Sequence, residues 1–284
     1  MKVLVTGSEG YIGSNLRQMF PESWRFIGYD VKRGLDVCDT DTLSTYVRDV
    51  DAVIHLAALS GHQACESDVM KCLEVNIFAT EDLADLCSAY GVDLVYAASF
   101  APTSTLYGFT KAVATEIVLD RGGRVFYLSN VYGGSNYVRM KDSLIAKWIK
   151  RLKAGRPIVV YGNGSQKRDF IHVVDVCRNI IRFVKSDYKQ AYICTGVLTS
   201  VNLILNLFRH FVSKRRDLEL EVKYELRRKT YSTPLCQPTF PWDVTVEQGV
   251  LQLLNEEFPP KRRPEDVSDP RKARHHTLDM HIRQ

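Results

Sequence analysis

The chain has 284 residues, of which 45% are hydrophobic and 25% are charged, and its formal net charge is +5. This length can bury one large core, or one core and a smaller lobe, and so mild and scattered a positive charge gives no reason to expect a nucleic-acid partner. No apolar run approaches the ~20 residues that span a bilayer, and no signal peptide is visible, so the sequence predicts a soluble cytoplasmic protein without membrane contact.

The first expected element is a strand that leads directly into a glycine-rich turn. Residues 2–5 favour a strand, and Gly7, Gly10 and Gly13 follow with the spacing G-x-x-G-x-x-G. Gly7 permits a tight turn, Gly10 allows a pyrophosphate to approach the backbone, and Gly13 allows the next helix to pack closely. The following strand ends in Asp30, about 20 residues further on, where the ribose 2′-hydroxyl of NAD is usually held. This pattern predicts a dinucleotide-binding turn.

Strands and helices then alternate through the first half of the chain. Apolar strands are expected at residues 51–58, 92–98 and 124–128, and helices near residues 40–48, 65–90 and after residue 107. The alternation predicts an α/β fold with a doubly wound parallel sheet, whose strands are buried on both faces.

Beyond residue 133 the regular alternation ends and the expected strands and helices are shorter, which indicates a smaller C-terminal lobe. We predict a dinucleotide-binding Rossmann domain at residues 1–133, to which segments near 158–195 return, and a mainly substrate-binding lobe at 134–254. Residues 255–284 are rich in proline and charge, and we expect a tail that is disordered or loosely docked.

The cysteines and histidines give no support for a metal site. The seven cysteines, at positions 38, 65, 72, 87, 177, 194 and 236, include no Cys-x-x-Cys spacing, and the seven histidines are scattered. This pattern favours reduced thiols in an intracellular core.

Three residues near the fourth strand have the chemistry of a proton-transfer site. Ser99 ends that strand, and ligands bind at the carboxyl edge of open α/β sheets. Tyr107 and Lys111 are four residues apart and therefore share one face of the following helix. An ammonium beside a phenol favours the phenolate, which allows a tyrosine to act as a general base at neutral pH.

These residues resemble the extended short-chain dehydrogenase/reductases, and among them the NAD-dependent sugar-nucleotide epimerases and dehydratases. The resemblance runs from residue 1 to about residue 254. It is carried by Thr6–Gly13 (T-G-x-x-G-Y-I-G), His55–Ala58 (H-L-A-A), Asn76–Thr80 (N-x-x-G-T, with Ala79 for the glycine), Leu128–Gly133 (R-x-x-N-V-Y-G) and Gly162–Val176 (G-D-G-x-Q-x-R-D-F-I-H-V-x-D-V).

The resemblance implies a role for each matched residue. The catalytic residues would be Ser99, Tyr107 and Lys111. Those that bind the cofactor would be Gly7, Gly10, Tyr11, Ile12, Gly13, Asp30, Asp36, Val37, Leu56, Ala57, Ala58, Asn76, Tyr107 and Lys111. Those that bind the substrate would be Ser99, Asn130, Arg168 and Arg228, with Asn130 and the two arginines on the diphosphate. No residue would bind a metal.

The resemblance also implies an activity. We expect an NAD-dependent 4-epimerase of nucleotide-diphosphate sugars that works through a transient 4-keto intermediate and assembles as a homodimer. Asp30 favours NAD over NADP because a carboxylate repels a 2′-phosphate, although Lys32 and Arg33 could offset that repulsion. The alternatives are an NAD(P)H-dependent 4-keto sugar-nucleotide reductase and a dinucleotide-binding sensor without turnover.

Two departures from the family pattern affect this expectation. Ser99 and Tyr107 are only eight residues apart, whereas the epimerases have a much longer interval, so we expect a more open sugar pocket. Phe100 and Ala101 stand where the dehydratases carry an acidic pair, which argues against dehydration.

Overall fold

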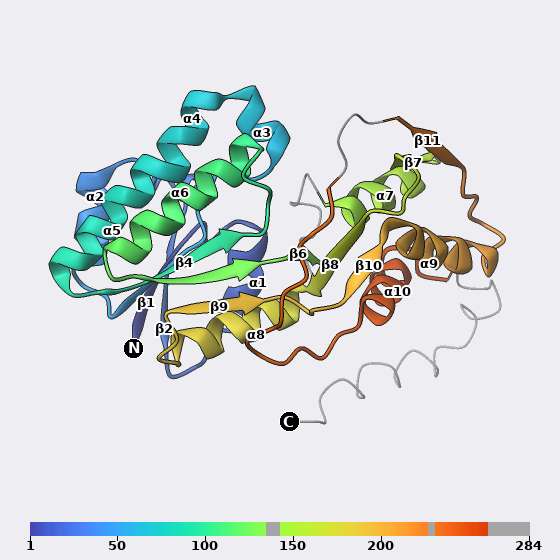
Figure 1. Ribbon diagram of the computed structural model, residues 1–284. Coiled ribbons are helices and arrows are strands. Elements are labelled where there is room, and N and C mark those ends of the chain that lie inside the picture. The colour runs from blue at the N-terminus through green and yellow to red at the C-terminus, as the bar shows by residue number, and fades with distance from the viewer. Residues whose placement is uncertain (135–142, 227–230, 261–284) are drawn as a thin grey trace, which may run out of the picture.

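The computed structural model describes residues 1–134, 143–226 and 231–260, and its centre is a six-stranded parallel sheet (Figure 1). The strand order is β2-β1-β3-β4-β5-β9, and every neighbouring pair is parallel. The strands are β1 (Lys2–Thr6), β2 (Arg25–Tyr29), β3 (Ala52–His55), β4 (Asp93–Ser99), β5 (Arg124–Leu128) and β9 (Gln190–Ile193). The predicted α/β doubly wound fold is confirmed.

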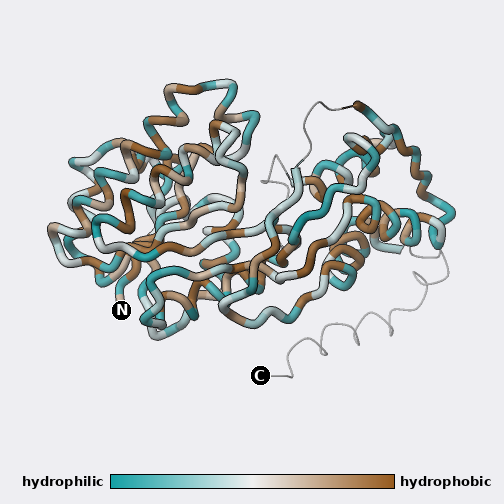
Figure 2. Tube along the Cα trace, in the orientation of Figure 1, coloured by the Kyte–Doolittle hydropathy of each residue, from teal (hydrophilic) through white to brown (hydrophobic). Residues whose placement is uncertain are grey.

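Helices cover both faces of this sheet because successive strand side chains point to opposite sides. Val3 and Val5 belong to the core cluster that includes residues of α1 (Tyr11–Gln18) and α8 (Val173–Val184). Leu4, between them, belongs to the other cluster. That cluster includes residues of α2 (Thr40–Val47), α5 (Ala79–Tyr90) and α6 (Leu106–Asp120). The hydrophobic residues that recur along the central strands are visible in Figure 2.

The expected long helix at 65–90 is interrupted. The chain forms α3 (His62–Ser67), α4 (Val69–Leu73), the π-helical turn η2 (Glu74–Phe78) and then α5. Asp68 separates α3 from α4 because its backbone is non-helical, with φ at −145° and ψ at 85°, and its side chain accepts a hydrogen bond from the Lys71 amide as a helix cap. The single-helix prediction is therefore wrong at Asp68.

The second lobe is built on two small sheets. One joins β10 (Leu198–Ser200), β8 (Lys167–His172) and β6 (Asn130–Tyr132), and the other pairs β11 (Val222–Glu225) with β7 (Ile158–Tyr161). The remaining helices are α7 (Leu144–Lys153), α9 (Val201–Ser213) and α10 (Val246–Glu257). The short 3-10 turn η1 (Val31–Arg33) follows β2.

The chain passes from the large sheet into the second lobe and back again. β6 enters it before the chain has completed the large sheet, and α8 and β9 return to that sheet afterwards (Figure 1). The expected tail boundary at residue 255 falls inside α10, and Phe258 just after this helix is buried. Residues 261–284 lie outside the described residues.

Candidate active site

The glycine-rich turn between β1 and α1 leaves no room for side chains. Gly7 has a φ of +68°, and a Cβ there would lie 2.8 Å from the Ala57 amide nitrogen. A Cβ on Gly10 would lie 2.9 Å from the Gly7 carbonyl oxygen, and one on Gly13 would lie 2.8 Å from Ser8 Cα. The turn is thus a close backbone cradle at the N-terminus of α1, suited to an anion such as a pyrophosphate.

Two side chains next to this cradle differ in their contacts. The Ser8 hydroxyl is fully buried, lies next to Gly28 of β2 and has no hydrogen-bond partner among the described residues. The Tyr11 hydroxyl instead donates to the Gly133 carbonyl at 2.7 Å and ties α1 to the loop after β6. Ile12, next in α1, is half-buried against the main core.

Asp30 lies directly beside the cradle. Its carboxylate is buried and accepts hydrogen bonds from the amides of Glu9 at 2.8 Å and Lys32 at 2.9 Å. A carboxylate can accept about four hydrogen bonds, so capacity for a ribose hydroxyl remains. The Lys32 ammonium donates to the Glu9 carbonyl, and Arg33 donates to the Gly28 carbonyl. Both cations are therefore already held by backbone oxygens.

Asp36 and Val37 follow β2 at the same edge of the sheet. Asp36 accepts a hydrogen bond from the Cys38 amide at 3.0 Å and lies 3.9 Å from the Lys71 ammonium. Val37 is buried in the cluster around α2 and α5. These contacts order the loop whose residues Asp36 and Val37 are expected to bind the cofactor.

A buried histidine orders the loop after β3, which contains Leu56, Ala57 and Ala58. His55 lies between the hydroxyls of Thr6 at 2.6 Å and Thr80 at 3.0 Å, and the Ala57 amide donates to Thr6 Oγ1. Complete burial lowers the pKa of His55 to about 3, with a smaller contribution from Lys111, so the ring is neutral at physiological pH. His55 is a structural support for this loop.

The three predicted catalytic residues lie at the carboxyl edge of β4 and the start of α6. Ser99 is the last residue of β4, and its hydroxyl accepts a hydrogen bond from the Ala101 amide at 3.1 Å. Thr105 caps α6 by accepting a hydrogen bond from the Gly108 amide, which places Tyr107 in the first turn. Lys111 lies one turn further along α6.

Lys111 is only 4% exposed. Its ammonium lies 4.0 Å from the centre of the Tyr96 ring. Burial lowers the pKa of Lys111 from 10.5 to about 7. The Tyr96 hydroxyl beside it is buried without a hydrogen-bond partner in the described ranges. The buried floor of the site therefore contains a lysine whose positive charge is destabilised by burial. Such a lowered pKa is a common feature of catalytic groups.

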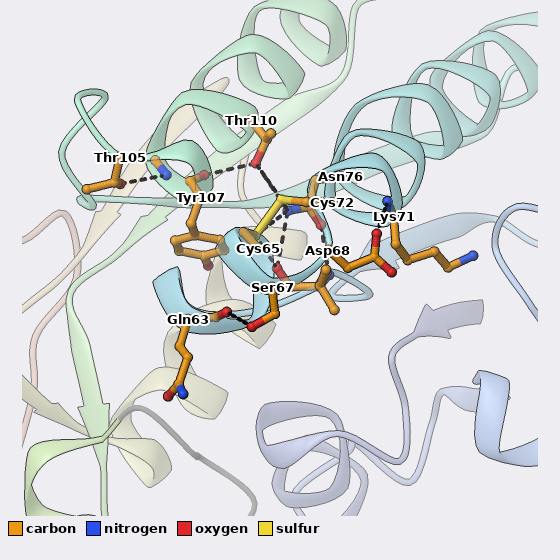
Figure 3. Close-up of a disulfide and its surroundings, with 12 residues drawn as sticks. Gln63, Cys65, Ser67, Asp68, Lys71, Cys72, Asn76, Thr105, Tyr107 and Thr110 are labelled. Carbon is orange, nitrogen blue, oxygen red and sulfur yellow. Dashed lines mark hydrogen bonds between the residues drawn. A yellow bond between two sulfur atoms is a disulfide. The ribbon is translucent and has the colours of Figure 1, made fainter.

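Asn76 is buried in η2 and braces the loop after β3. Its side-chain oxygen accepts from the Leu59 amide at 2.8 Å, and its nitrogen donates to Thr110 Oγ1 at 3.1 Å and to the Leu59 carbonyl. Figure 3 shows Tyr107 and Thr110 of α6 on the side of α6 that faces this cluster. In this structure Asn76 thus contacts protein groups on several sides.

A disulfide lies next to the Asn76 side chain. Cys65 of α3 and Cys72 of α4 are bonded to each other, and both are fully buried (Figure 3). The expectation of reduced thiols is therefore wrong for this pair, because the break at Asp68 folds α4 back and brings the two cysteines together, with a Cα–Cα distance of 5.0 Å. Cys38, Cys87, Cys177, Cys194 and Cys236 are free.

The predicted diphosphate-binding residues lie across the site in the second lobe. Asn130 starts β6 and donates to the Asp169 carbonyl and to Thr233 Oγ1, both at 3.0 Å. Arg168 of β8 stacks on Tyr231, with its guanidinium carbon 4.5 Å from the ring centre. Its Nε is buried without a hydrogen-bond partner in the described part of the chain, as expected of a donor that awaits an anion. Arg228 lies outside the described residues.

Sequence patterns did not reveal three residues that shape this lobe and its contact with Tyr107. His62 lies edge-to-face against Tyr107, with ring centres 5.9 Å apart, and its Nε2 is 3.1 Å from the Tyr231 hydroxyl. Asp169, beside Arg168, accepts hydrogen bonds from Ser129, Thr195 and Gly196. Asp169 lies inside a recognised motif and could have been found there, whereas nothing in the sequence marks His62 or Tyr231.

Comparison with known proteins identifies the family. The model of the NAD dependent epimerase/dehydratase family matches residues 3–193, which is more than half of the chain. The chain belongs to the NAD-dependent epimerase/dehydratase family.

Individual relatives are distant but cover most of the chain. A UDP-glucuronate 4-epimerase of Thermodesulfobacterium geofontis is 26% identical over 252 residues, 78% of this chain and 77% of its own length. A GDP-6-deoxy-D-talose 4-dehydrogenase of Aggregatibacter actinomycetemcomitans is 28% identical over 237 residues, 73% of this chain and 79% of its own. The structure of Thermus thermophilus UDP-glucose 4-epimerase with NAD superposes with a TM-score of 0.77 at 20% identity, and covers 90% of this chain and 99% of that one.

The site of this family member fits the dinucleotide that the family uses. The glycine cradle and the carboxylate of Asp30 suit a pyrophosphate followed by an unphosphorylated ribose. Among residues 1–134, 143–226 and 231–260 no group of three His, Cys, Asp or Glu could hold a metal ion. Over the same ranges no helix is both long and apolar enough to cross a membrane.

Proposed function

We propose that this protein is a nucleotide-diphosphate-sugar 4-epimerase with a resident NAD. One observation carries the proposal: Ser99, Tyr107 and Lys111 lie at the carboxyl edge of the same sheet whose first strand leads into the glycine cradle. Ligands of open α/β sheets bind at this edge. The relatives of this chain include a 4-epimerase and a 4-dehydrogenase, which supports chemistry at C4 of a sugar nucleotide.

Each residue of the trio has a separate task in this proposal. NAD, which the glycine cradle and Asp30 would hold, would supply the reversible hydride acceptor for C4 of the sugar. Tyr107 accepts the proton of the 4-hydroxyl and gives it back when the 4-keto sugar is reduced. Ser99 donates a hydrogen bond to the same oxygen and stabilises the charge that develops there. Lys111 supports the cofactor ribose and favours the phenolate of Tyr107.

Two residues of the second lobe hold the nucleotide while the sugar turns. The Arg168 guanidinium lies on the Tyr231 ring, and a planar guanidinium can bind a diphosphate through two hydrogen bonds. Asn130, in the neighbouring strand β6, is held by the Asp169 carbonyl and Thr233. Phe100 and Ala101 offer no carboxyl group next to Ser99, so acid-base elimination is disfavoured.

The alternative proposal is a reductase of 4-keto sugar nucleotides that exchanges NADPH. The observation in its favour is the pair Lys32 and Arg33 beside Asp30, which could bind a 2′-phosphate. We favour NAD because both cations already donate to backbone carbonyls and the Asp30 carboxylate faces the cradle. We further propose that the protein works as a homodimer in the cytoplasm.

The first test is to denature the purified protein and assay the released dinucleotide. Stoichiometric NAD, followed by interconversion of C4 epimers in a panel of UDP- and dTDP-hexoses, would support the proposal. Tyr107→Phe should retain the bound NAD and lose the activity. A protein that purifies empty and binds NADPH better than NAD would replace the epimerase with the reductase.

A further inference from the structure

A pair of aromatic side chains connects the two halves of the site. His62 begins α3, immediately after Gly61, whose φ is +97°. The His62 ring lies between two tyrosines, with centres 5.9 Å from Tyr107 and 5.7 Å from Tyr231, and both contacts are edge-to-face. Its Nε2 forms a hydrogen bond with the Tyr231 hydroxyl at 3.1 Å. His62 therefore contacts the expected proton-transfer tyrosine on one side and the second lobe on the other.

The other end of this connection is a short strap, residues 231–233, that runs beside β8. The Lys167 amide donates to the Ser232 hydroxyl, and the Thr233 amide donates to the Lys167 carbonyl. Thr233 also accepts from Asn130, and Arg168 stacks on the Tyr231 ring. The strap thus contacts both described residues that we assign to the diphosphate.

The contact between His62 and Tyr107 lies where the loop between Ser99 and Tyr107 is short. Ser99 and Tyr107 are separated by eight residues, so the loop that would flank Tyr107 is short. The Tyr107 ring instead has the His62 ring at its side, and His62 is held by a residue 169 positions away in the chain. Edge-to-face aromatic pairs fix ring orientation as well as adding packing energy.

We propose that His62 and Tyr231 are positioning residues for Tyr107, and that they link its orientation to the strap that carries the Arg168 contact. This inference rests on the proposed function, since it concerns the proton transfer assigned to Tyr107. On this view the diphosphate end of the substrate helps to order the residue that acts at the sugar, because both ends contact the same strap.

The test compares variants of the holoenzyme with a nucleotide sugar that the wild type converts. His62→Phe keeps a ring against Tyr107 but removes the hydrogen bond, and Tyr231→Phe removes the same bond from the other side. Each should lower kcat about three- to tenfold, the effect of one partly buried hydrogen bond on a reacting geometry, while KM stays within about twofold. The matched control is Gln63→Ala on the exposed side of α3, which should leave both constants unchanged.

Two further variants separate positioning from loss of packing. The double variant His62→Phe with Tyr231→Phe should be no slower than the slower single variant, because both remove one interaction. His62→Gln offers a new partner to the Tyr231 hydroxyl and should recover part of kcat. Additive losses in the double variant, an unchanged kcat in either single variant, or a fall of equal size in Gln63→Ala would overturn the inference.

A failure of the proposed function can be distinguished from a failure of the positioning role. A wild type that converts no sugar nucleotide would overturn the 4-epimerase and leave the link between His62 and Tyr107 open to a structural measurement. Amide hydrogen exchange of residues 106–111 should then be faster in His62→Phe and Tyr231→Phe than in the wild type and Gln63→Ala. Equal exchange in all four proteins would overturn the positioning role.

Discussion

Replacing Lys111 by methionine should stabilise the protein at neutral pH while abolishing the proposed activity. Lys111 is 4% exposed and its ammonium faces the Tyr96 ring at 4.0 Å. Burial lowers its pKa from 10.5 to about 7, and a shift of that size corresponds to about 5 kcal/mol against the charged form. The contact with the ring returns roughly 2 kcal/mol. A methionine, which fills the space without a charge, should therefore raise the free energy of unfolding by roughly 2–3 kcal/mol.

The stabilisation should fade as the pH rises. The unfolded chain keeps the Lys111 proton up to about pH 10.5, whereas the folded chain releases it near pH 7. The cost of the buried charge is therefore full at or below pH 7 and shrinks by up to about 3 kcal/mol between pH 7 and pH 9. His55, whose pKa Lys111 also lowers, is neutral at pH 7 and at pH 9 in both proteins, so its titration does not enter the comparison.

Urea unfolding of the dinucleotide-free wild type and Lys111→Met, at both pH values, measures this difference. Lys150→Met on the exposed face of α7 is the control, and it should change the stability at neither pH. The reasoning is refuted if Lys111→Met is less stable than the wild type at pH 7, or if its gain is as large at pH 9 as at pH 7.

Two further predictions concern the scaffold. Arg124 is buried, pairs with Asp93, and donates to the carbonyls of Phe183 in α8 and of Ser186 just after it, so Arg124→Met should lower the free energy of unfolding by about 3 kcal/mol. In the same urea assay Arg121→Ala, which removes only partly exposed surface ion pairs, should unfold nearly like the wild type. Superimposable curves for both variants would contradict a stabilising role of the buried Arg124 contacts. Alkylation of the denatured protein should label five thiols without reductant and all seven after reduction, because Cys65 and Cys72 are bonded; seven in both cases would show a reduced pair. Closing this short loop contributes about 2–3 kcal/mol in the chain-entropy model, so Cys65→Ser should be less stable by a similar amount.

Local patterns were sufficient to predict the sheet and the glycine turn. The alternation of apolar strands with helices predicts a parallel sheet because each strand must be buried on both faces, and the glycines mark a turn that excludes Cβ atoms within a few residues of sequence. Ser99, Tyr107 and Lys111 were also placed from short-range information, since one strand end and one helix turn fix where they lie.

The residues that were missed depend on contacts distant in sequence or on a helix break. His62 and Tyr231 are 169 residues apart, and no local pattern relates an imidazole in one lobe to a phenol in the other. The Cys65–Cys72 bond follows from the interruption at Asp68, where a capping side chain competes with continued helix. Hydrophobic periodicity alone runs through that interruption and therefore predicted one helix.

The short loop between Ser99 and Tyr107 requires a glycine at position 108, and the reason is packing rather than ligand binding. Gly108 lies within α6, where alanine would ordinarily be favoured by about 1 kcal/mol. A Cβ there would instead lie 2.6 Å from the Pro102 carbonyl carbon and 2.8 Å from the Ala101 carbonyl oxygen. The turn before α6 can therefore pack against the helix only while position 108 has no side chain.

Gly108→Ala should consequently displace the first turn of α6 and Tyr107 with it. We expect kcat to fall by about tenfold or more, since small displacements of a reacting group have effects of that size. Gly155→Ala is the matched control, because Gly155 has a φ of +58° and open space around a Cβ. That variant should lose stability through backbone strain alone and keep its kcat. If Gly108→Ala kept kcat while Gly155→Ala lost it, the packing of the turn against α6 would not be what positions Tyr107.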